Sequence, residues 1–350
     1  MLWFRLADRH WLASALVFGL LWLPGCGFFA DRETRMDHYV QALAEALERQ
    51  SELSDIPTVE PLPRRRERVL DVPSLNLGLV DFLSLYGCDL QVVVGERTSV
   101  LGRVMGAGKR LEYEIRFLAA ARDCLPEIEN ERRAEQVADV AWTKEEHLPS
   151  TIWNGLWGTE EMETLFSRSQ GTLPEQSRDE AFAELADSLR ELLRFLEELG
   201  PGQKPDNLDV LSANYQLWRS EALLGKLLRS AEALQTRLND AAHLLEESSL
   251  DASICDGLGA PPQALYRELY RDEAGPRVAR VQTHRGQVLP LLARLLEKPG
   301  VVIPEAMYPF VARNLEVSGE TSVWADLDAA VRRHDRAWMQ LISVCKSDKP

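Results

Sequence analysis

The sequence predicts an all-α protein, an irregular multi-helix bundle built around a long antiparallel helical hairpin. Apolar residues recur at spacings of three and four from residue 36 onward, which places them on one face of each helix. An amphipathic pattern over 178–199 is followed by the turn-forming segment GPGQKPD and by a second long pattern over 207–247. The sequence shows no strand-like alternation of useful length and no internal repeat of fixed period.

The N-terminal segment has the pattern of a secretory signal. Arg5 and Arg9 precede a run of apolar or small residues over 11–23, which is shorter than the roughly 20 residues that a membrane-spanning helix needs. We therefore expect residues 1–25 to be a signal peptide that is removed from the working protein.

The segment Leu23-Pro24-Gly25-Cys26 resembles a bacterial lipobox, although Pro24 is an unusual residue in its position. This resemblance implies cleavage before Cys26 and acylation of its thiol, so that the protein is held at a membrane by a lipid anchor. The alternative is an ordinary signal peptide with a cysteine near its end. Because Gly27 rather than an aspartate follows the cysteine, resemblance to sorted lipoproteins favours the periplasmic face of the outer membrane.

Charge and cysteine usage limit the possible partners and the compartment. The formal net charge of −15 disfavours contact with phosphate backbones, so we expect no nucleic-acid partner. An even number of cysteines after Cys26 predicts two disulfides in an oxidising compartment, although buried free thiols are the alternative. Of three possible pairings we favour Cys88 with Cys124 and Cys255 with Cys345, which close loops of moderate length.

The first part of the mature chain divides into three regions. Residues 26–54 hold the lipidated N-terminus and a first helix, whose apolar stripe begins at Met36. Residues 55–76 contain four prolines and form an extended connector. Its RRRER run (64–68) is either solvated or in contact with anionic headgroups or lipopolysaccharide phosphate. Residues 77–350 form the helical domain, with a short-helix subdomain over 77–170 and a long-helix bundle over 175–350.

The short-helix subdomain begins with a dense apolar stretch. We expect short helices broken at Gly87, Gly95 and Gly102, then a firmer helix over 109–124 and another over 128–147. The β-branched segment QVVVG is compatible with a short buried strand, but its neighbours have helical periodicity, and we favour a helix.

The long-helix bundle is predicted to contain the central hairpin. The pattern over 207–247 indicates one continuous helix of about 60 Å, antiparallel to the helix over 178–199. A long helix over 261–298 follows, interrupted near Gly275-Pro276 and strained at Pro290. A short helix over 303–315 and a final one over 322–343 complete the bundle.

Three segments carry a family resemblance. GLVDFLSLYGCDLQVVVGERTSVLGR (78–103), preceded by PLPRRRER and followed by IWNGLWGTEEMETLFS (152–167), resembles a family of uncharacterised lipoproteins of Gram-negative bacteria that contain a domain of unknown function. The matching residues are Leu79, Asp81, Leu83, Cys88, Glu96, Arg97 and Gly102. Thr98 departs from the family pattern, in which asparagine is common. The resemblance implies a periplasm-facing lipoprotein and transfers no catalytic residue.

No segment of the sequence has the residue spacing of a known cofactor-binding or metal-binding motif. Asp240 is the one acidic residue three positions before a histidine, His243, and a helical di-metal site needs a second copy. The chain has no HExxH motif, GAGKR does not meet phosphate-loop spacing, and no serine has the flanking glycines of a hydrolase elbow. We expect no cofactor and no metal.

The candidate binding residues fall into two groups. Trp153 and Trp157 are four residues apart, so they form either a platform for a sugar or lipid or a pair of core anchors. Glu96 and Arg97, with Asp81, are either a polar site or a structural ion pair.

The sequence favours a non-enzymatic binding or scaffolding role at the outer membrane, with an envelope protein, a lipid or a glycan as partner. The alternative is an envelope hydrolase with an unrecognised active site near Asp81, Glu96 and Arg97, with His147 as a further member. A purely structural spacer is a third possibility.

Overall fold

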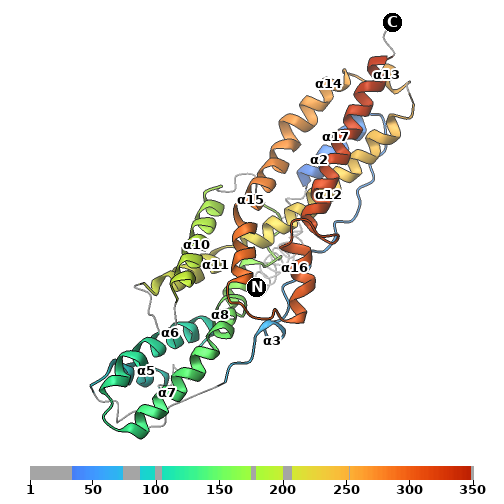
Figure 1. The fold of residues 1–350 in the computed structure, drawn as a ribbon. Coiled ribbons are helices and arrows are strands. Elements are labelled where there is room, and N and C mark those ends of the chain that lie inside the picture. Colours follow the sequence, from blue (N-terminus) through green and yellow to red (C-terminus); the bar gives the residue numbers. More distant parts are fainter. Residues whose placement is uncertain are drawn as a thin grey trace, which may run out of the picture.

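The computed structural model describes residues 34–73, 87–98, 105–174, 179–199, 207–251 and 253–347. Within these ranges the regular structure is entirely helical and contains no strand, which confirms the all-α class (Figure 1). The elements are α2 (Thr34–Ala46), α3 (Arg65–Arg68), α5 (Asp89–Thr98), α6 (Ala107–Cys124), η3 (Leu125–Glu127), α7 (Glu131–Glu146), α8 (Leu148–Trp157), α9 (Glu160–Leu165), α10 (Asp179–Glu198), α11 (Asp209–Ser220), α12 (Leu223–Ser248), α13 (Ile254–Gly257), α14 (Pro262–Leu265), η4 (Tyr266–Ala274), α15 (Gly275–Glu297), η5 (Glu305–Met307), α16 (Tyr308–Asn314) and α17 (Val323–Ser347). None of the described helices is both long and apolar enough to cross a bilayer.

The centre of the fold is the pair α12 and α17, which run in the same direction (Figure 1). Arg313 bridges Glu232, in the first half of α12, and Asp326, near the start of α17. Further along, Arg333 of α17 binds Glu246 of α12, with Nη2 and Oε2 2.7 Å apart. This order of contacts requires parallel helices.

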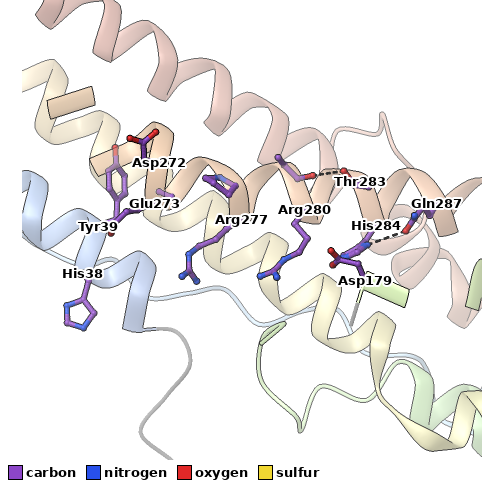
Figure 2. Close-up of a pocket in the computed structure, with 13 residues that line it drawn as sticks. His38, Tyr39, Asp179, Asp272, Glu273, Arg277, Arg280, Thr283, His284 and Gln287 are labelled. Carbon is purple, nitrogen blue, oxygen red and sulfur yellow. Dashed lines mark hydrogen bonds and ion pairs between the residues drawn. The ribbon is translucent and has the colours of Figure 1, made fainter. Parts of the chain in front are cut away.

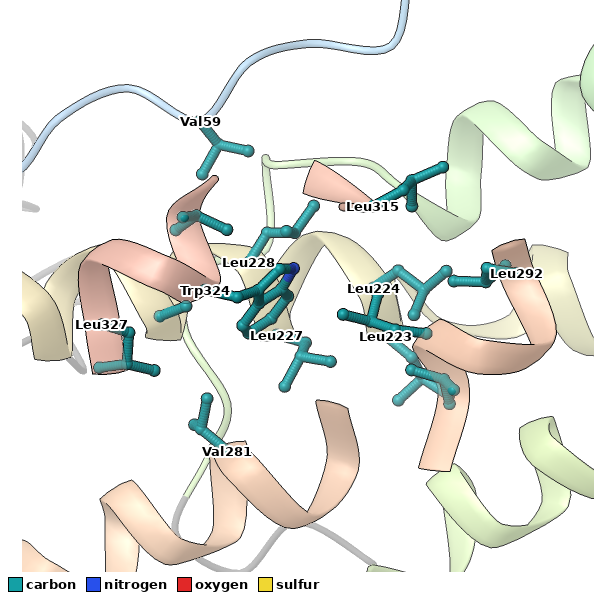
Figure 3. Packing of buried hydrophobic residues seen from close by; sticks show 14 of the residues in the cluster. Val59, Leu223, Leu224, Leu227, Leu228, Val281, Leu292, Leu315, Trp324 and Leu327 are labelled. Atoms are coloured by element: carbon teal, nitrogen blue, oxygen red, sulfur yellow. The ribbon is translucent and has the colours of Figure 1, made fainter. Parts of the chain in front are cut away.

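Apolar side chains fill the space between the central helices. In Figure 3 the Trp324 ring lies among leucines of α12, with Val281 and Leu292 of α15 nearby. Trp324 and Trp338 of α17 are both fully buried. A Trp side chain buries a large apolar area, so these two rings contribute strongly to the pairing of α17 with α12.

Both predicted disulfides are confirmed. Cys255 and Cys345, just beyond α12 and near the end of α17, are bonded with their Cα atoms 5.3 Å apart. Cys88 and Cys124, at the start of α5 and the end of α6, are bonded with Cα atoms 5.6 Å apart. Each bridge therefore joins two helices at one end.

The expectation of one continuous helix over 207–247 is wrong. Helix α11 ends at Ser220, Glu221 is extended with φ −147° and ψ 146°, and α12 begins at Leu223. Ala222 and Leu223 are buried at this break, so tertiary packing redirects a chain that contains no glycine or proline there. Helix α10 packs against α11 and α15, whereas α12 packs most extensively against α17.

A second, smaller apolar cluster lies between α5, α6 and α7, at one end of the elongated molecule (Figure 1). The segment QVVVG is helical, as favoured from its neighbours. The predicted break at Gly95 is wrong, because α5 continues through it, and Gly102 lies outside the described residues. The domain boundaries inferred from the sequence stay predictions.

The connector is fixed by Arg68, the one buried residue of the RRRER run; residues 64–67 are exposed, as a solvated run predicts. This side chain is fully buried, and its Nε donates to the carbonyl of Trp157 at 2.5 Å. It also donates to the carbonyls of Pro63 and Thr159 and forms an ion pair with Glu163. One arginine of the run thus holds the connector against α8 and α9.

The predicted helix over 261–298 contains a π-helical segment. Element η4 is a π-helix of 9 residues that ends where Gly275-Pro276 begins α15, and the Gly275 N–H donates to the Tyr270 carbonyl five residues back. Pro276 has no N–H to continue the α-helical ladder, which accounts for a wider turn before it. Such π-segments are frequent at functional sites.

Candidate functional site

Two of the three candidate polar residues, Glu96 and Arg97, lie on α5 and contact side chains of α6. Glu96 binds Arg116, with Oε2 and Nη1 2.6 Å apart, and this hydrogen bond holds the pKa of the Glu96 carboxyl below its usual range. The Arg97 guanidinium lies 5.9 Å from the centre of the Tyr113 ring. Asp81 lies outside the described residues. The side chains of Glu96 and Arg97 therefore make contacts between α5 and α6.

Trp153 and Trp157 are fully buried in the main core. Their ring centres are 6.0 Å apart, and the Trp153 indole N–H donates to the carbonyl of Arg68 at 2.7 Å. A ligand platform needs an open ring face, and here both rings pack inside the protein. Their position is that of core anchors, the other role considered from the sequence.

The Asp240 and His243 pair does not form half of a metal site. Asp240 is buried and binds Arg237, whereas His243 is exposed and lies 3.4 Å from Glu247. Over the described part of the chain, no group of three or more histidine, cysteine or acidic side chains is arranged to hold a metal ion.

Sequence analysis missed a buried ion pair between Lys144 of α7 and Glu114 of α6. The atoms Nζ and Oε2 are 2.6 Å apart, and the Lys144 ammonium lies 4.9 Å from the centre of the Phe117 ring. Burial lowers the pKa of Lys144. No pattern distinguished this lysine from its exposed neighbours, and its role is to join two helices of the small cluster.

The feature that stands out as a binding site is a groove along η4 and α15, called the α15 groove below (Figure 2). Its volume is about 870 Å³, within the range of small-molecule sites. It is lined by His38, Tyr39, Asp179, Asp272, Glu273, Ala274, Pro276, Arg277, Ala279, Arg280, Thr283, His284 and Gln287. The lining therefore combines the N-terminal helix α2, the π-helix, α15 and the first residue of α10.

Two arginines extend into the α15 groove side by side from α15 (Figure 2). Arg277 and Arg280 are three residues apart, which places them on one helix face. Both also line an adjoining narrow cleft of about 50 Å³. The remaining lining of this cleft is mostly apolar: Met36, Thr172, Leu173, Ser230, Ala233, Leu234 and Val281. Arg277 and Arg280 thus line both the polar α15 groove and the small, mostly apolar cleft beside it.

The far end of the groove is occupied by His284 and Asp179. The His284 ring is 1% exposed and stacks on Phe182 with ring centres 4.0 Å apart. Its Nδ1 lies 3.2 Å from Gln287 Oε1, which orients the ring. Its Nε2 lies 3.2 Å from Asp179 Oδ1 but has no hydrogen bond of acceptable geometry among the described residues. A buried ring nitrogen thus faces the Asp179 carboxylate at this end of the groove.

At the other end, Tyr39 connects the groove to a buried aromatic cluster. Its hydroxyl lies 2.5 Å from His334 Nε2 and 3.1 Å from Trp338 Nε1. Burial raises the pKa of the Tyr39 hydroxyl and lowers the pKa of His334. Both groups are therefore neutral near pH 7, so this end of the groove is lined by uncharged aromatic side chains.

The sequence contained one indication of this site. Gly275-Pro276 marked an interruption in the helix, and two arginines follow within four residues. What the sequence did not contain is the arrangement that brings α2 and Asp179 to the same place, because these contacts span more than 100 residues.

Comparison with known proteins gives a family but no characterised relative. The family model described as "Protein of unknown function (DUF3080)" matches residues 36–348. No curated protein and no solved structure matches the sequence.

Proposed function

The chain belongs to the DUF3080 family of proteins of unknown function, whose family model matches from α2 to the end of α17. This membership covers residues 36–348 and assigns no activity to them. Any function for this unit must therefore be argued from the geometry of its surface.

We propose that this protein is a lipid-anchored, non-enzymatic binding protein of the bacterial cell envelope and that the α15 groove is its binding site. The observation that carries the proposal is a hollow of about 870 Å³ with charged and polar side chains converging on it beside a π-helix. The first described helix, α2, contributes His38 and Tyr39 to this groove.

The position of α2 connects the groove with the proposed anchor. Thr34, the first residue of α2, follows Cys26 by only eight positions in the sequence. A chain of that length reaches at most about 28 Å when fully extended. Acylation of Cys26 would therefore hold the groove close to the membrane surface.

Two further features support an envelope location. Both disulfides join cysteines on different elements, and such bonds persist in oxidising compartments. Gly27 after the lipobox cysteine favours the outer membrane, with the protein on the periplasmic face. We do not extend the proposal to hydrolysis, because Glu96 and Arg97 are each engaged by other side chains.

The anchor and the binding role are tested separately. Mass spectrometry of the protein from cells should find a diacylated or triacylated Cys26 at the N-terminus, and an intact residue 1–25 segment would contradict the anchor. For the binding role, a photo-crosslinking residue at Thr283 in the groove should capture an envelope component in living cells. The same residue at the exposed Gln136 of α7 is the control. Equal crosslinking from Thr283 and Gln136 would show that the groove is not the binding site.

A further inference from the structure

We propose that the ligand of the α15 groove is a zwitterion of the phosphoethanolamine type, with its phosphate on Arg277 and Arg280 and its ammonium group on Asp272 and Glu273. This inference rests on the proposed function and names the class of ligand that the groove takes. It uses the charges of the groove, their spacing and their distance from the proposed anchor.

The groove carries both signs of charge in separate places. Asp272 and Glu273 lie at the end where η4 meets Tyr39, and the two arginines follow along α15 (Figure 2). A purely anionic ligand that filled the groove would place charge against the carboxylates, and a cationic one would place charge against the arginines. A ligand with one charge of each sign matches the acidic end beside Tyr39 and the two arginines that follow it, whereas Asp179 lies beyond them at the far end.

Two guanidinium groups one turn apart favour phosphate over carboxylate. A single arginine engages both oxygens of a planar carboxylate with two parallel hydrogen bonds, whereas the tetrahedral phosphate group directs its unesterified oxygens, two in a diester and three in a monoester, away from one plane and can accept from two arginines at once. Arg277 and Arg280 also interact with other groups of the protein. Each guanidinium has five N–H donors, so it can hold a neighbour and a ligand together.

The spacing of the opposite charges favours ethanolamine over an amino acid. Glu273, near the end of the π-helix η4, precedes Arg277 of α15 by four residues, so the two side chains are about one helical turn apart along the chain. In phosphoethanolamine an oxygen and two carbons separate phosphorus from nitrogen. In an α-amino acid a single carbon separates the two charged groups, so phosphoethanolamine spans a longer distance between its charges.

Isothermal titration calorimetry of the purified full-length protein in detergent tests the ligand class. Glycerophosphoethanolamine should bind more tightly than glycerol 3-phosphate, and alanine should not bind. Arg277→Gln/Arg280→Gln should weaken both phosphate compounds by at least about tenfold, the loss expected for charge-assisted hydrogen bonds. The matched control is Arg267→Gln/Arg271→Gln, which removes the same charge from exposed positions of η4 and should leave both affinities unchanged.

The carboxylate end is tested by Asp272→Asn/Glu273→Gln, two substitutions at exposed positions that preserve size. They should remove the preference for glycerophosphoethanolamine and leave the binding of glycerol 3-phosphate in place. Circular dichroism and thermal unfolding confirm that each variant folds. Binding of alanine, a preference that survives this double substitution, or equal affinities in the arginine variant and its control would each overturn the proposal.

Vesicles distinguish a membrane lipid from a free headgroup. Flotation should be stronger with vesicles that contain phosphatidylethanolamine than with pure phosphatidylcholine or phosphatidylglycerol vesicles, and the gain should disappear in Arg277→Gln/Arg280→Gln. Binding of glycerophosphoethanolamine without this gain assigns the site to the soluble headgroup. If Thr283 captures an envelope component while no phosphate compound binds, the ligand class is wrong and the binding role stands. If neither occurs, both are wrong.

Discussion

The hydroxyl of Tyr39 lies 2.5 Å from Nε2 of His334, although 295 positions separate the two residues in the sequence. Trp338 Nε1 lies 3.1 Å from the same hydroxyl. If Trp338 donates to Tyr39 and Tyr39 donates to His334, each polar atom of this chain has one partner. The arrangement assigns the His334 proton to Nδ1, which lies 3.7 Å from the Asp335 carboxylate.

This contact makes the stability of the protein sensitive to acid. Burial is the main cause of the lowered pKa of His334, while Asp335 opposes it. The unfolded chain then binds a proton at a pH where the folded chain does not, so stability falls as the pH drops below the unfolded value of about 6.5. We expect a loss of about 1 kcal/mol between pH 7.5 and 5.5 from this group, measured by urea unfolding. His334→Gln should flatten this dependence, and exposed His243→Gln should keep it; an identical slope in both variants would contradict the assignment.

Arg68→Met should destabilise the protein by about 2–4 kcal/mol, because it leaves buried carbonyl groups without their donor and breaks the ion pair with Glu163. Arg66→Met is the control, since the Arg66 side chain is 74% exposed. Guanidinium unfolding midpoints measure both. Similar values for the two variants would mean that the connector is not held through Arg68.

Two glycine substitutions should have opposite effects. A Cβ at Gly225 of α12 would collide with the backbone carbonyl of Ser167, so Gly225→Ala should cost at least about 2 kcal/mol. A Cβ at Gly286 of α15 meets nothing within 4 Å, so Gly286→Ala should gain about 0.5–1 kcal/mol from helix propensity alone. Thermal unfolding of the two variants tests the close approach of α12 to the segment after α9. The prediction fails if Gly225→Ala is as stable as the wild type.

Cys255→Ser/Cys345→Ser should lower the free energy of unfolding by about 4–5 kcal/mol, the chain-entropy value for a bridge between residues 90 positions apart. Cys88→Ser/Cys124→Ser, across 36 positions, should lower it by slightly less. Urea unfolding with and without dithiothreitol measures both losses. Reduction should destabilise each double variant further through the bridge that it retains, and a double variant insensitive to dithiothreitol would contradict the pairing.

Local pattern was sufficient for the helices and for the cysteine pairs, because helical periodicity and loop length are properties of short segments. It failed at Glu221, where buried Ala222 and Leu223 break the helix without any local signal. It also could not distinguish Arg68 from Arg66, since burial of one arginine in a run depends on which segment folds over it.

Local sequence pattern could not predict the binding site, for the same reason. The sequence indicated an interruption at Gly275-Pro276, but the groove exists only because α2 and Asp179 are packed beside α15. The tryptophans chosen as candidates are large and apolar, and such residues are more often needed for packing than for ligands. The arginines that line the groove have no unusual spacing in the sequence, so only the folded structure identifies them as groove residues.

The parallel pairing of α12 and α17 has a consequence for folding. Residues 249–322 separate the two helices, so the chain delivers α12 well before the helix that covers it. For an exported chain this interval falls at the exit from the inner membrane. Until α17 has followed, a largely apolar face of α12 is open to water and to other chains, and aggregation competes with correct assembly.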